Sequence, residues 1–508
     1  MTTKTDILQF PIYINGEWVA AKNGETFEIT NPATGQVCAH VAKGTKEDID
    51  TAVQSARRAF NSGIWSKKSP EERAKILIQF SNKIAENAEQ LVYLESISSG
   101  GTLNRIANSD ILQLVELLQE TAKFTREYQY VESLPTKTFP GPSDNQVWRE
   151  PIGVCAAITP WNFPMILAMW KIAPALAMGN SIVIKPASYT PLSTLKLAEL
   201  AVEAGLPGGV FNVVAGPGSS TGAALVTHQE VDKVAFTGST EVGRSIMQQA
   251  AGTVKKVSLE LGGKSPAIVL PDAHLDTTIP GILFGVFLHS GQICESGTRV
   301  FVHDSIYDEV IEKLKYAAST IKLGHPLENT TGMGPLVSER QLQKVLDYIE
   351  TGKQEGASLI CGGKRAVSGN LKDGFYVEPT IFADVNNTMK IAQEEIFGPV
   401  LSVIRYSDVQ EAVDLANDTI YGLAAGVWCG DVNKALPIAK ELKAGTIWIN
   451  DWHMFRSDAP FGGYKQSGFG RELGRHALDE YTETKHVHTS LVPELEQRPW
   501  YSILFGNE

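Results

Sequence analysis

Short apolar runs alternate with longer amphipathic segments between residues 181 and 263. The runs have the length and composition of buried strands, and the segments between them, such as PLSTLKLAELAVEAG (191–205), carry apolar residues at helical spacing. Parallel strands need a crossover connection, which is usually a helix. We therefore expect βαβ units that build a doubly wound parallel sheet. The predicted strands are SIVIKPA (181–187), FNVVAG (211–216), VDKVAFTG (231–238) and KKVSLELGG (255–263).

A second region with the same alternation lies towards the C-terminus. Residues 300–321 and 401–418 each predict a strand followed by a helix, and GTIWIN (445–450) predicts another strand. The N-terminal part is expected to be mainly helical, for example over 46–62 and 71–96. A chain of 508 residues is too long for one simple core, so more than one domain is expected. The alternating pattern in both regions predicts an α/β fold class with two sheet domains.

The predicted domain limits follow from this pattern. One α/β domain comprises 1–129 and 152–262, and the second comprises 263–470. Residues 130–151 and 471–508 fit neither domain and are expected to form a small β element and a tail. The tail is extended and half apolar, so it is a candidate edge strand for another subunit. Packing on its own chain is the alternative.

Charge and cysteine content narrow the class of partner. The net charge is −12 at pH 7, with acidic and basic residues interspersed, which disfavours nucleic acid and anionic membrane surfaces. The five cysteines lie far apart without a CxxC pair, so we expect no disulfide framework, no metal site and a cytoplasmic location. The start of the chain lacks a sustained apolar core, so no signal peptide is predicted. The apolar stretch 153–184 carries Asn162, Lys171 and Asn180, which favours a buried strand and helix over a membrane span.

Two glycine-bearing loops follow predicted strands. AGPGSSTG (215–222) is close to a dinucleotide fingerprint, and FTGSTEVG (236–243) places Gly238 and Ser239 between a strand and a helix. Small residues let backbone N–H groups approach a phosphate, and the helix dipole favours an anion. Glycine required only by the turn is the alternative for both loops.

Three other polar residues are candidates for chemistry. Glu260 ends a strand beside two glycines, where a carboxyl with a raised pKa can act as a general base; an ion pair with Lys264 or a solvated loop is the alternative. Asn162 in TPWNFP follows a buried strand, so its amide either forms a turn or points at an oxyanion. Cys294 in GQICESGTR is either a packing thiol or a nucleophile.

Seven motifs in one fixed order decide between these alternatives. PWNFP, IVIKPA, FTGSTEVG, LELGGKSP, GQICESGTR, EEIFGP (394–399) and PFGGYKQSGFGRELG (460–474) resemble the NAD(P)-dependent aldehyde dehydrogenase superfamily. The resemblance runs from INGEW (14–18) to the tail. It implies that the first domain binds a dinucleotide, that the second is the catalytic domain with a nucleophilic cysteine, and that the small β element serves oligomerisation.

The implied reaction explains the thiol. An aldehyde carbon is a poor hydride donor until a thiolate has added to it. By resemblance, Cys294 forms a thiohemiacetal, which gives a hydride to NAD(P) and becomes a thioester. The amide of Asn162 and the backbone N–H of Cys294 would hold the oxyanion. Glu260 would activate the hydrolytic water and is a candidate to deprotonate Cys294 first. Lys171 and Glu472 match a proton-relay pair of some members, with a buried salt bridge as the alternative.

One departure from the family bears on the cofactor. Many NAD-preferring relatives carry glutamate three residues after the lysine of IVIKPA, where this chain has Ser188. Serine does not repel a 2′-phosphate, so NAD is expected as cofactor with NADP also accepted. The other implied cofactor contacts are Trp161 and Lys185 at the adenosine half, Gly238 and Ser239 at the pyrophosphate, Glu395 at the nicotinamide ribose and Phe397 beside the nicotinamide.

The implied substrate tunnel has apolar walls. Such walls suit an uncharged aliphatic or aromatic aldehyde, and Leu288, where some relatives have phenylalanine, leaves room for a bulky one. Arg456 and His453 are expected near the mouth, and no lysine or arginine is otherwise placed to bind an acidic substrate. The implied tunnel residues are Phe163, Ile166, Trp170, Ile293, Phe455 and Phe461.

Two other functions are weighed against aldehyde oxidation. CoA-acylating relatives generally lack a glutamate at the position of Glu260. A cofactor-binding structural protein that has lost catalysis would not need Cys294 and Asn162. The expected partners are therefore a small-molecule aldehyde and further copies of the chain, with a homotetramer favoured over a dimer by the resemblance.

Overall fold

The region around residues 181–263 forms the parallel centre of an eight-stranded sheet in the computed structural model, which describes residues 7–139 and 141–505. Chain order reverses between β8 (Val154–Ile158) and β11 (Lys233–Thr237), which lie side by side in parallel. The carboxyl ends of two such strands open the crevice where doubly wound sheets bind ligands. The full order is β20 (Gly468–Phe469), β12 (Lys256–Glu260), β11, β8, β9 (Ser181–Lys185), β10 (Phe211–Val213), β2 (Ile12–Ile14) and β3 (Glu17–Val19), with β20, β2 and β3 antiparallel to their neighbours.

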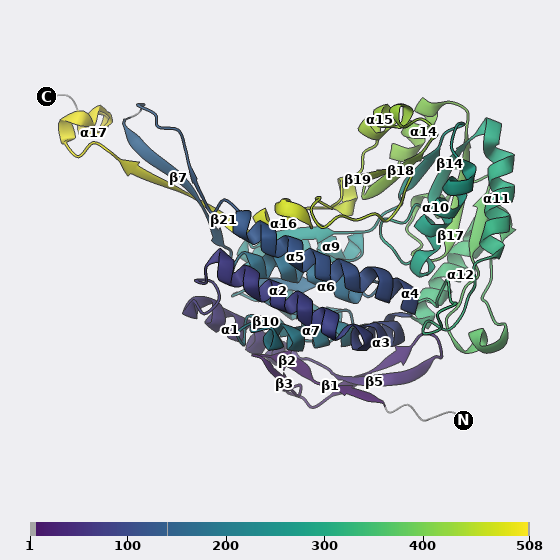
Figure 1. The fold of residues 1–508 in the computed structure, drawn as a ribbon, viewed down its shortest axis with the longest axis horizontal. Helices are drawn as coiled ribbons and strands as arrows, with labels where there is room; N and C mark the ends of the chain where they lie inside the picture. The colour runs from purple at the N-terminus through teal and green to yellow at the C-terminus, as the bar shows by residue number, and fades with distance from the viewer. Residues whose placement is uncertain (1–6, 140, 506–508) are drawn as a thin grey trace.

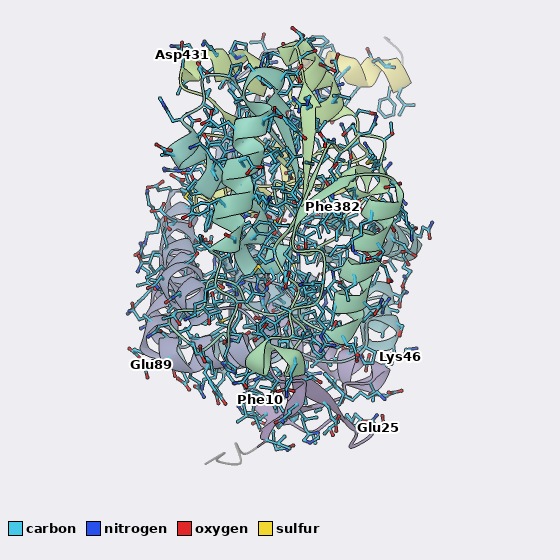
Figure 2. The ribbon with its side chains drawn as sticks, turned by 90° about the vertical axis from the view of Figure 1, so that its right-hand side faces the viewer. Phe10, Glu25, Lys46, Glu89, Phe382 and Asp431 are labelled. Atoms are coloured by element: carbon cyan, nitrogen blue, oxygen red, sulfur yellow. The ribbon has the colours of Figure 1, made fainter. Side chains whose placement is uncertain are left out.

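A seven-stranded sheet forms the second α/β unit. All its neighbours are parallel except the edge pair β15–β16. The interior of this sheet is apolar: in Figure 2 Phe382 of β16 lies inside the molecule, whereas Glu25, Lys46, Glu89 and Asp431 lie at its periphery. Its order is β15 (Ser358–Cys361), β16 (Thr380–Ala383), β17 (Val400–Tyr406), β14 (Arg299–His303), β13 (Pro266–Val269), β18 (Ala424–Trp428) and β19 (Thr446–Ile449).

The helices before the first sheet begin and end at capping residues. Thr45 and Asp48 form a capping box at the start of α1 (Lys46–Ser62), which ends at Gly63 with a φ of 78°. Ser69 and Glu72 form another box at the start of α2 (Pro70–Glu86). Each cap of this kind stabilises a helix by about 1 kcal/mol. The segment predicted as helical over 71–96 is divided at Asn87, after which α3 (Ala88–Ser99) begins.

Residues 7–42 contradict the expectation of a mainly helical N-terminal part. They form five strands: β2 and β3 extend the eight-stranded sheet, and the others make a separate three-stranded sheet. Three of the five have only three residues each, which is too short for a period of two to be recognised. The separate sheet has the order β1 (Leu8–Phe10), β5 (Gln36–Ala42) and β4 (Thr26–Asn31). The prediction that no signal peptide is present concerns a segment of which residues 1–6 lie outside the described ranges.

The apolar stretch after residue 153 forms strand β8 and helix α6 (Pro164–Ala177), as predicted. Every residue of α6 is buried, Lys171 included. Within the described ranges, no helix is both long and apolar enough to cross a membrane.

A π-helical turn interrupts the long helix that packs on α6. Leu103–Arg105 (α4), Ile106–Asp110 (the π turn) and Ile111–Glu127 (α5) follow one another without a gap. The turn contacts α3 and α5. π turns of this kind occur mostly as single insertions in α-helices near functional sites.

The remaining long helices cover the two large sheets. In Figure 1, α5, α2 and α7 lie over the first sheet, and α10, α11, α14 and α15 lie around the second. Their bounds are α7 (Leu192–Glu203), α9 (Thr240–Ala250), α10 (Leu275–Phe287), α11 (Tyr307–Ser319), α12 (Glu339–Gln354), α14 (Val409–Asn417) and α15 (Val432–Glu441). The short helices are α8 (Ala223–Thr227), α13 (Lys390–Gln393), α16 (Gly474–Asp479) and α17 (Ser502–Phe505).

A three-stranded antiparallel arm projects from the first unit (Figure 1). Its middle strand β7 (Ser143–Pro151) pairs with β6 (Val131–Ser133) on one side and with β21 (Thr482–Ser490) on the other. The tail therefore pairs with its own chain through one edge of β21, and the other edge of that strand is the edge of the sheet. The arm lies within the segments predicted as a small β element, and the predicted domain limits stay a prediction.

Candidate active site

Cys294 lies in the segment that connects α10 to β14. Upstream of it, His289 and Ser290 have φ values of 50° and 58°, a left-handed conformation that non-glycine residues rarely adopt. Gly263 packs against the same segment, and a Cβ there would lie 2.3 Å from the carbonyl oxygen of Cys294. Only glycine allows LELGGKSP and GQICESGTR to approach this closely.

Two cavities meet at Cys294. The larger has a volume of about 280 Å³ and the smaller a volume of about 170 Å³. Cys294, Asn162 and Leu167 line both of them. A thiol at this position can contact one ligand on each side.

Asn162 follows β8 and lies two residues before the first residue of α6. Its side chain is 3% exposed, and its Nδ2 donates a hydrogen bond of 2.8 Å to the carbonyl oxygen of Gln292. The amide is therefore fixed against the segment that carries Cys294.

Cys294 contacts an acidic neighbour that the sequence interpretation gave no role. Its Sγ donates a hydrogen bond of 3.1 Å to Oε2 of Glu295, and Oε1 of Glu295 lies 2.8 Å from Nδ1 of His453. Burial and the Glu295 carboxylate raise the pKa of the Cys294 thiol well above its usual value. The sulfur is therefore protonated in this state.

Glu260 is buried at the end of β12. Its Oε2 has no hydrogen-bond partner in the described part of the chain, and the alternative ion pair with Lys264 is not formed there. Burial, and secondly the Glu472 carboxylate, raise the pKa of Glu260 well above its usual value. Within the described ranges, Glu260 thus keeps one buried oxygen without a partner and forms no ion pair, which suits a general base.

Lys171 and Glu472 form an ion pair in the interior. Nζ of Lys171 lies 2.5 Å from Oε1 of Glu472 and donates a hydrogen bond of 2.6 Å to Oγ1 of Thr237. Thr237 is the register partner of Glu260 in the β11–β12 pair. The pair therefore lies beside the candidate base, and its role as a proton relay stays a prediction.

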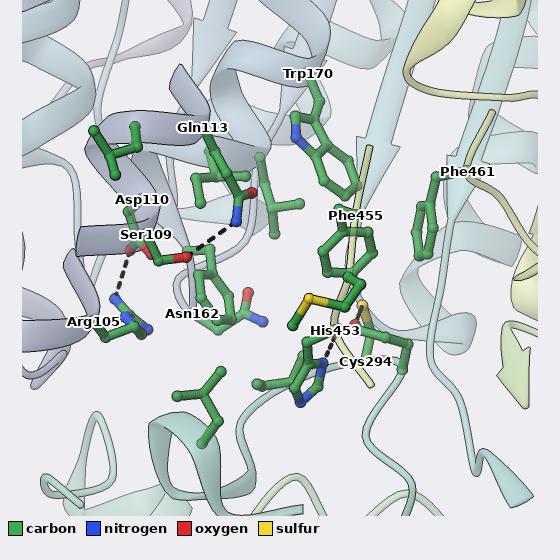
Figure 3. A pocket seen from close by; sticks show the side chains of 18 of the residues that line it. Arg105, Ser109, Asp110, Gln113, Asn162, Trp170, Cys294, His453, Phe455 and Phe461 are labelled. Carbon is green, nitrogen blue, oxygen red and sulfur yellow. Dashed lines mark hydrogen bonds and ion pairs between the residues drawn. The ribbon is translucent and has the colours of Figure 1, made fainter. Parts of the chain in front are cut away.

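The larger cavity has an aromatic wall (Figure 3). Trp170, Phe455 and Phe461 contact one another edge to face, with ring centroids 5.2 to 5.5 Å apart. All six residues predicted for the substrate tunnel line this cavity together with Cys294: Phe163, Ile166, Trp170, Ile293, Phe455 and Phe461. Leu288 lines it as well.

The opposite end of this cavity is polar, which the sequence interpretation missed. Arg105 lines it, and its guanidinium lies 4.4 Å from the centroid of the Phe163 ring. Arg105 also lies 3.0 Å from Oδ2 of Asp110. The guanidinium is thus paired with a carboxylate at this end of the cavity. Figure 3 shows Arg105 and Asp110 across the cavity from Trp170 and Phe461.

The smaller cavity lies at the crevice between the ends of β8 and β11. Ser239 caps α9 there, accepting a hydrogen bond from the backbone N–H of Val242. Oε1 of Glu395 accepts a hydrogen bond of 3.0 Å from the backbone N–H of Gly263. Five of the predicted cofactor residues line this cavity: Trp161, Gly238, Ser239, Glu395 and Phe397.

The other two predicted cofactor residues, Lys185 and Ser188, lie elsewhere. Burial lowers the pKa of Lys185 to about 8, and a Cβ on Gly222 would lie 3.6 Å from its Cδ. Oγ of Ser188 donates a hydrogen bond of 3.0 Å to the carbonyl oxygen of Gly216. Both therefore lie beside the loop 215–222, away from the wall of the smaller cavity.

Comparison with known proteins decides what the site belongs to. The model of the aldehyde dehydrogenase family matches residues 18–487. The chain belongs to the aldehyde dehydrogenase family. This confirms the prediction made from the seven motifs and identifies the chain as an aldehyde oxidoreductase.

Similar proteins of this family cover nearly the whole chain. The betaine aldehyde dehydrogenase of Bacillus subtilis is 46% identical over 95% of this chain and 98% of its own length. An aldehyde dehydrogenase of Emericella nidulans is 43% identical over 96% of this chain and 98% of its own. The structure of betaine aldehyde dehydrogenase from Staphylococcus aureus in complex with NAD+ has a TM-score of 0.93 and 42% identity, and covers 96% of each chain. These aldehyde dehydrogenase structures confirm the predicted fold class.

Two residues that shape the aldehyde dehydrogenase site, Gln341 and Lys344, belong to none of the seven motifs. Nε2 of Gln341 donates a hydrogen bond of 2.8 Å to the carbonyl oxygen of Phe397, which has a φ of 61°. Nζ of Lys344 donates to the carbonyl oxygen of Glu395. Both come from α12, far from EEIFGP in the sequence. Only the fold brings them there.

Proposed function

We propose that this aldehyde dehydrogenase oxidises an uncharged aldehyde with an apolar aliphatic or aromatic body to the carboxylic acid, with NAD or NADP as hydride acceptor. The observation that carries the proposal is the position of Cys294 at the meeting point of an aromatic cavity and a cleft at a helix N-terminus. The aldehyde would enter from the first side and the dinucleotide from the second.

Cys294 is proposed as the nucleophile. Its sulfur adds to the carbonyl carbon, and the carbonyl oxygen becomes an oxyanion beside the segment 292–294. The amide of Asn162 exchanges its present bond to Gln292 for one to the oxyanion, and the backbone N–H of Cys294 is the second donor. The thiohemiacetal then loses a hydride and becomes a thioester. Glu260 takes a proton from the water that hydrolyses the thioester, and the buried Lys171–Glu472 pair is proposed to pass that proton on.

The smaller cavity is proposed to hold part of a dinucleotide. Gly262 lines it, and a Cβ on this glycine would lie 2.6 Å from Oε2 of Glu395, so the floor of the cavity has no room for a side chain. The N-terminus of α9 offers backbone N–H groups to a pyrophosphate. Glu395 is proposed to hold the nicotinamide ribose and Phe397 to pack beside the ring. When bound, the nicotinamide supplies the acceptor for the hydride.

Acceptance of both NAD and NADP is proposed on Ser188. It is half-buried, neutral and bonded to the carbonyl oxygen of Gly216, so it presents no negative charge to a 2′-phosphate. Lys185 is also a predicted contact of the adenosine half, and its side chain carries an amine in place of a carboxylate.

An apolar substrate body is proposed on the cavity wall. Trp170, Phe455 and Phe461 offer ring faces and edges, and Ile166 and Ile293 offer aliphatic surface. A cationic quaternary ammonium aldehyde is the second candidate. Two points favour it: aromatic rings bind such cations, and two of the similar proteins, from Bacillus subtilis and Staphylococcus aureus, are betaine aldehyde dehydrogenases.

The alternatives make different demands on the site. Within residues 7–139 and 141–505, Glu260 keeps one buried oxygen free of hydrogen bonds. A structural protein without catalysis would not need such an unpartnered carboxylate. A CoA-acylating enzyme has no use for a hydrolytic base at that position. Both observations favour hydrolysis to the acid.

Assembly into a homo-oligomer is proposed on the arm, whereas the preference for a tetramer over a dimer rests on the family resemblance alone. β21 is an edge strand, and most of its side chains are exposed. An open edge of nine residues is a surface on which a second copy can pair. Light scattering on the full-length chain measures the mass directly, and a monomer would overturn this part.

The test is steady-state formation of reduced cofactor from benzaldehyde and from betaine aldehyde, each with NAD and with NADP. We expect benzaldehyde to have the higher kcat/KM, with the two cofactors within tenfold of each other. A preference for betaine aldehyde would replace the apolar substrate by the cationic one. Cys294→Ala should lower kcat by at least about 10⁴-fold. A variant that keeps its activity would contradict the role of Cys294 as the nucleophile.

A further inference from the structure

A chain of three side chains leads away from the sulfur of Cys294. The thiol donates to Glu295 Oε2 at 3.1 Å, and the other oxygen of the same carboxylate contacts Nδ1 of His453 at 2.8 Å. The two contacts occupy both oxygens of Glu295. Cys294 and Glu295 are neighbours in sequence, whereas His453 comes from the segment after β19.

This carboxylate is held in place. Glu295 is 2% exposed and His453 is 7% exposed. Nε1 of Trp452 donates a hydrogen bond of 3.2 Å to the backbone carbonyl oxygen of Glu295. The ring of His453 packs edge to face against Phe284, and its Nε2 has no hydrogen-bond partner within the described ranges. The backbone of Glu295 is therefore held by Trp452, and its side chain is held by its contacts to Cys294 and His453.

Glu260 occupies a different environment. Its neighbours are the Lys171–Glu472 pair and the strand end at Thr237, and no hydrogen bond joins it to Cys294 in the described part of the molecule. Among the described residues, the Glu295 carboxylate thus contacts the thiol, and the Glu260 carboxylate forms neither a hydrogen bond to the thiol nor an ion pair. The two acids are placed for two different proton transfers.

We propose that Glu295 is the base that takes the thiol proton when Cys294 attacks the aldehyde, that His453 is its positioning residue, and that Glu260 serves the hydrolysis step. The proposal rests on the proposed function of Cys294 as nucleophile. As the S–C bond forms, the S–H bond breaks and the proton moves to Glu295 Oε2. The π electrons of the carbonyl move to its oxygen, which becomes the oxyanion. After hydrolysis the thiolate leaves and takes the proton back from Glu295.

The charges around the sulfur favour this order of events. The Glu295, Glu395 and Glu260 carboxylates all raise the pKa of Cys294, and among them only Glu295 is hydrogen-bonded to the sulfur in the described part of the chain. Three carboxylates and burial oppose a free thiolate, so the proton must leave as the new bond forms. A base in direct contact with the thiol is what such a step requires.

The experiment measures the first turnover separately from the later ones. Wild type, Glu295→Gln and Glu260→Gln are each mixed with NAD and benzaldehyde in a stopped-flow spectrophotometer, and the thioester is followed by acid quench and mass spectrometry. Glu295→Gln should slow the first turnover by about 10²- to 10⁴-fold, the usual worth of a positioned base. Its remaining rate should rise in proportion to hydroxide. Glu260→Gln should keep a fast first turnover and accumulate the thioester on Cys294.

Other outcomes have a defined meaning. A first turnover of Glu295→Gln within tenfold of wild type would overturn the proposal, and so would an equal slowing by Glu260→Gln. Activity in Cys294→Ala would instead overturn the proposed function on which it rests. His453→Gln should slow the first turnover less than Glu295→Gln and shift its pH profile, which a purely structural role would not do.

Controls separate chemistry from folding. Glu312→Gln removes an exposed carboxylate on α11 and should behave as wild type. Thermal melting and NAD binding establish that each variant is folded. Should Glu295→Gln fail to fold, Glu295→Asp keeps the charge but shortens the side chain by one carbon. It should again slow the first turnover by more than tenfold while leaving hydrolysis of the thioester unchanged, and an unaltered first turnover would overturn the proposal.

Discussion

The cleft at the ends of β8 and β11 and the aromatic cavity meet at one sulfur, but they are built in different ways. The cleft is lined mostly by short contiguous motifs at strand ends, such as Trp161–Asn162 after β8 and Gly238–Ser239 after β11. The cavity takes its walls from α5, α6 and the segments around Ile293 and Phe455. A cleft of the first kind is fixed by the sheet, whereas a cavity of the second kind depends on how separate elements pack.

The difference teaches which parts can change independently. Dinucleotide binding needs backbone geometry at the strand ends, which the sheet supplies whatever the substrate is. Substrate preference depends on the side chains of the aromatic cavity, most of which do not line the cleft. Only Asn162, Leu167 and Cys294 belong to both cavities, so they alone should couple the two functions.

The largest expected effect comes from a shared residue. Asn162→Ala removes one oxyanion donor and should lower kcat/KM by about 10²- to 10³-fold for every aldehyde tested. NAD affinity, measured by fluorescence titration, should stay within about twofold, because Asn162 is proposed to act on the oxyanion only. A parallel loss of NAD affinity and turnover would contradict the separation of the cleft from the aromatic cavity.

A residue of the aromatic cavity alone should affect substrates only. Phe461→Ala removes one ring of the wall and should lower kcat/KM for benzaldehyde by about 10- to 100-fold, which corresponds to about 1.5–3 kcal/mol of lost apolar contact. Acetaldehyde should lose less, since it reaches less of the wall. Equal losses for the two aldehydes, with melting unchanged, would show that the ring does not contact the substrate body.

The pH dependence of hydrolysis should be common to all substrates. Burial and Glu472 raise the pKa of Glu260, and a base acts only when it is ionised. As pH falls below that raised pKa, the carboxylate is protonated and hydrolysis should slow about tenfold per pH unit. Thioester breakdown measured across pH with both cofactors checks this. The prediction would be contradicted if the hydrolysis rate fell only near the ordinary carboxyl pKa, or if the same fall with pH remained in Glu260→Gln.

The smallest expected effect lies at the far end of the cofactor. Ser188→Glu places a negative charge where a 2′-phosphate would bind and should lower kcat/KM with NADP about fivefold, since two such charges repel by about 1 kcal/mol in water. Efficiency with NAD should hardly change. Ser188→Gln is the matched control without charge, and a similar loss in that variant would assign the effect to size.

Much of the fold follows from the sequence because its signals are local. Alternating apolar runs predict the parallel strands from β9 to β12, and capping residues mark where α1 and α2 begin. Strands of three residues before α1 carry no such signal, so a helical N-terminal part was expected there. Their place in a sheet is decided by partners distant in the chain.

The site divides in the same way. Motifs predict Cys294, Asn162 and the residues of the cleft, since each belongs to a short contiguous stretch of sequence. The contact between Glu295 and His453 joins residues that are far apart in sequence, and neither has a pattern that points to the other. Arg105 was missed for the same reason, because a helix face gives no hint of the cavity it lines.

The π-helical turn at Ile106–Asp110 has a consequence for how the wall of the aromatic cavity can change during evolution. A residue in an α-helix occupies about 100° of rotation, so removing one residue from the turn would rotate Arg105 by about that angle relative to the α5 residues Gln113 and Glu116. A single codon deletion would then exchange an entire strip of tunnel wall for its neighbour while leaving the nucleophile untouched. Insertion and deletion, and not substitution alone, are therefore evolutionary routes to a new aldehyde.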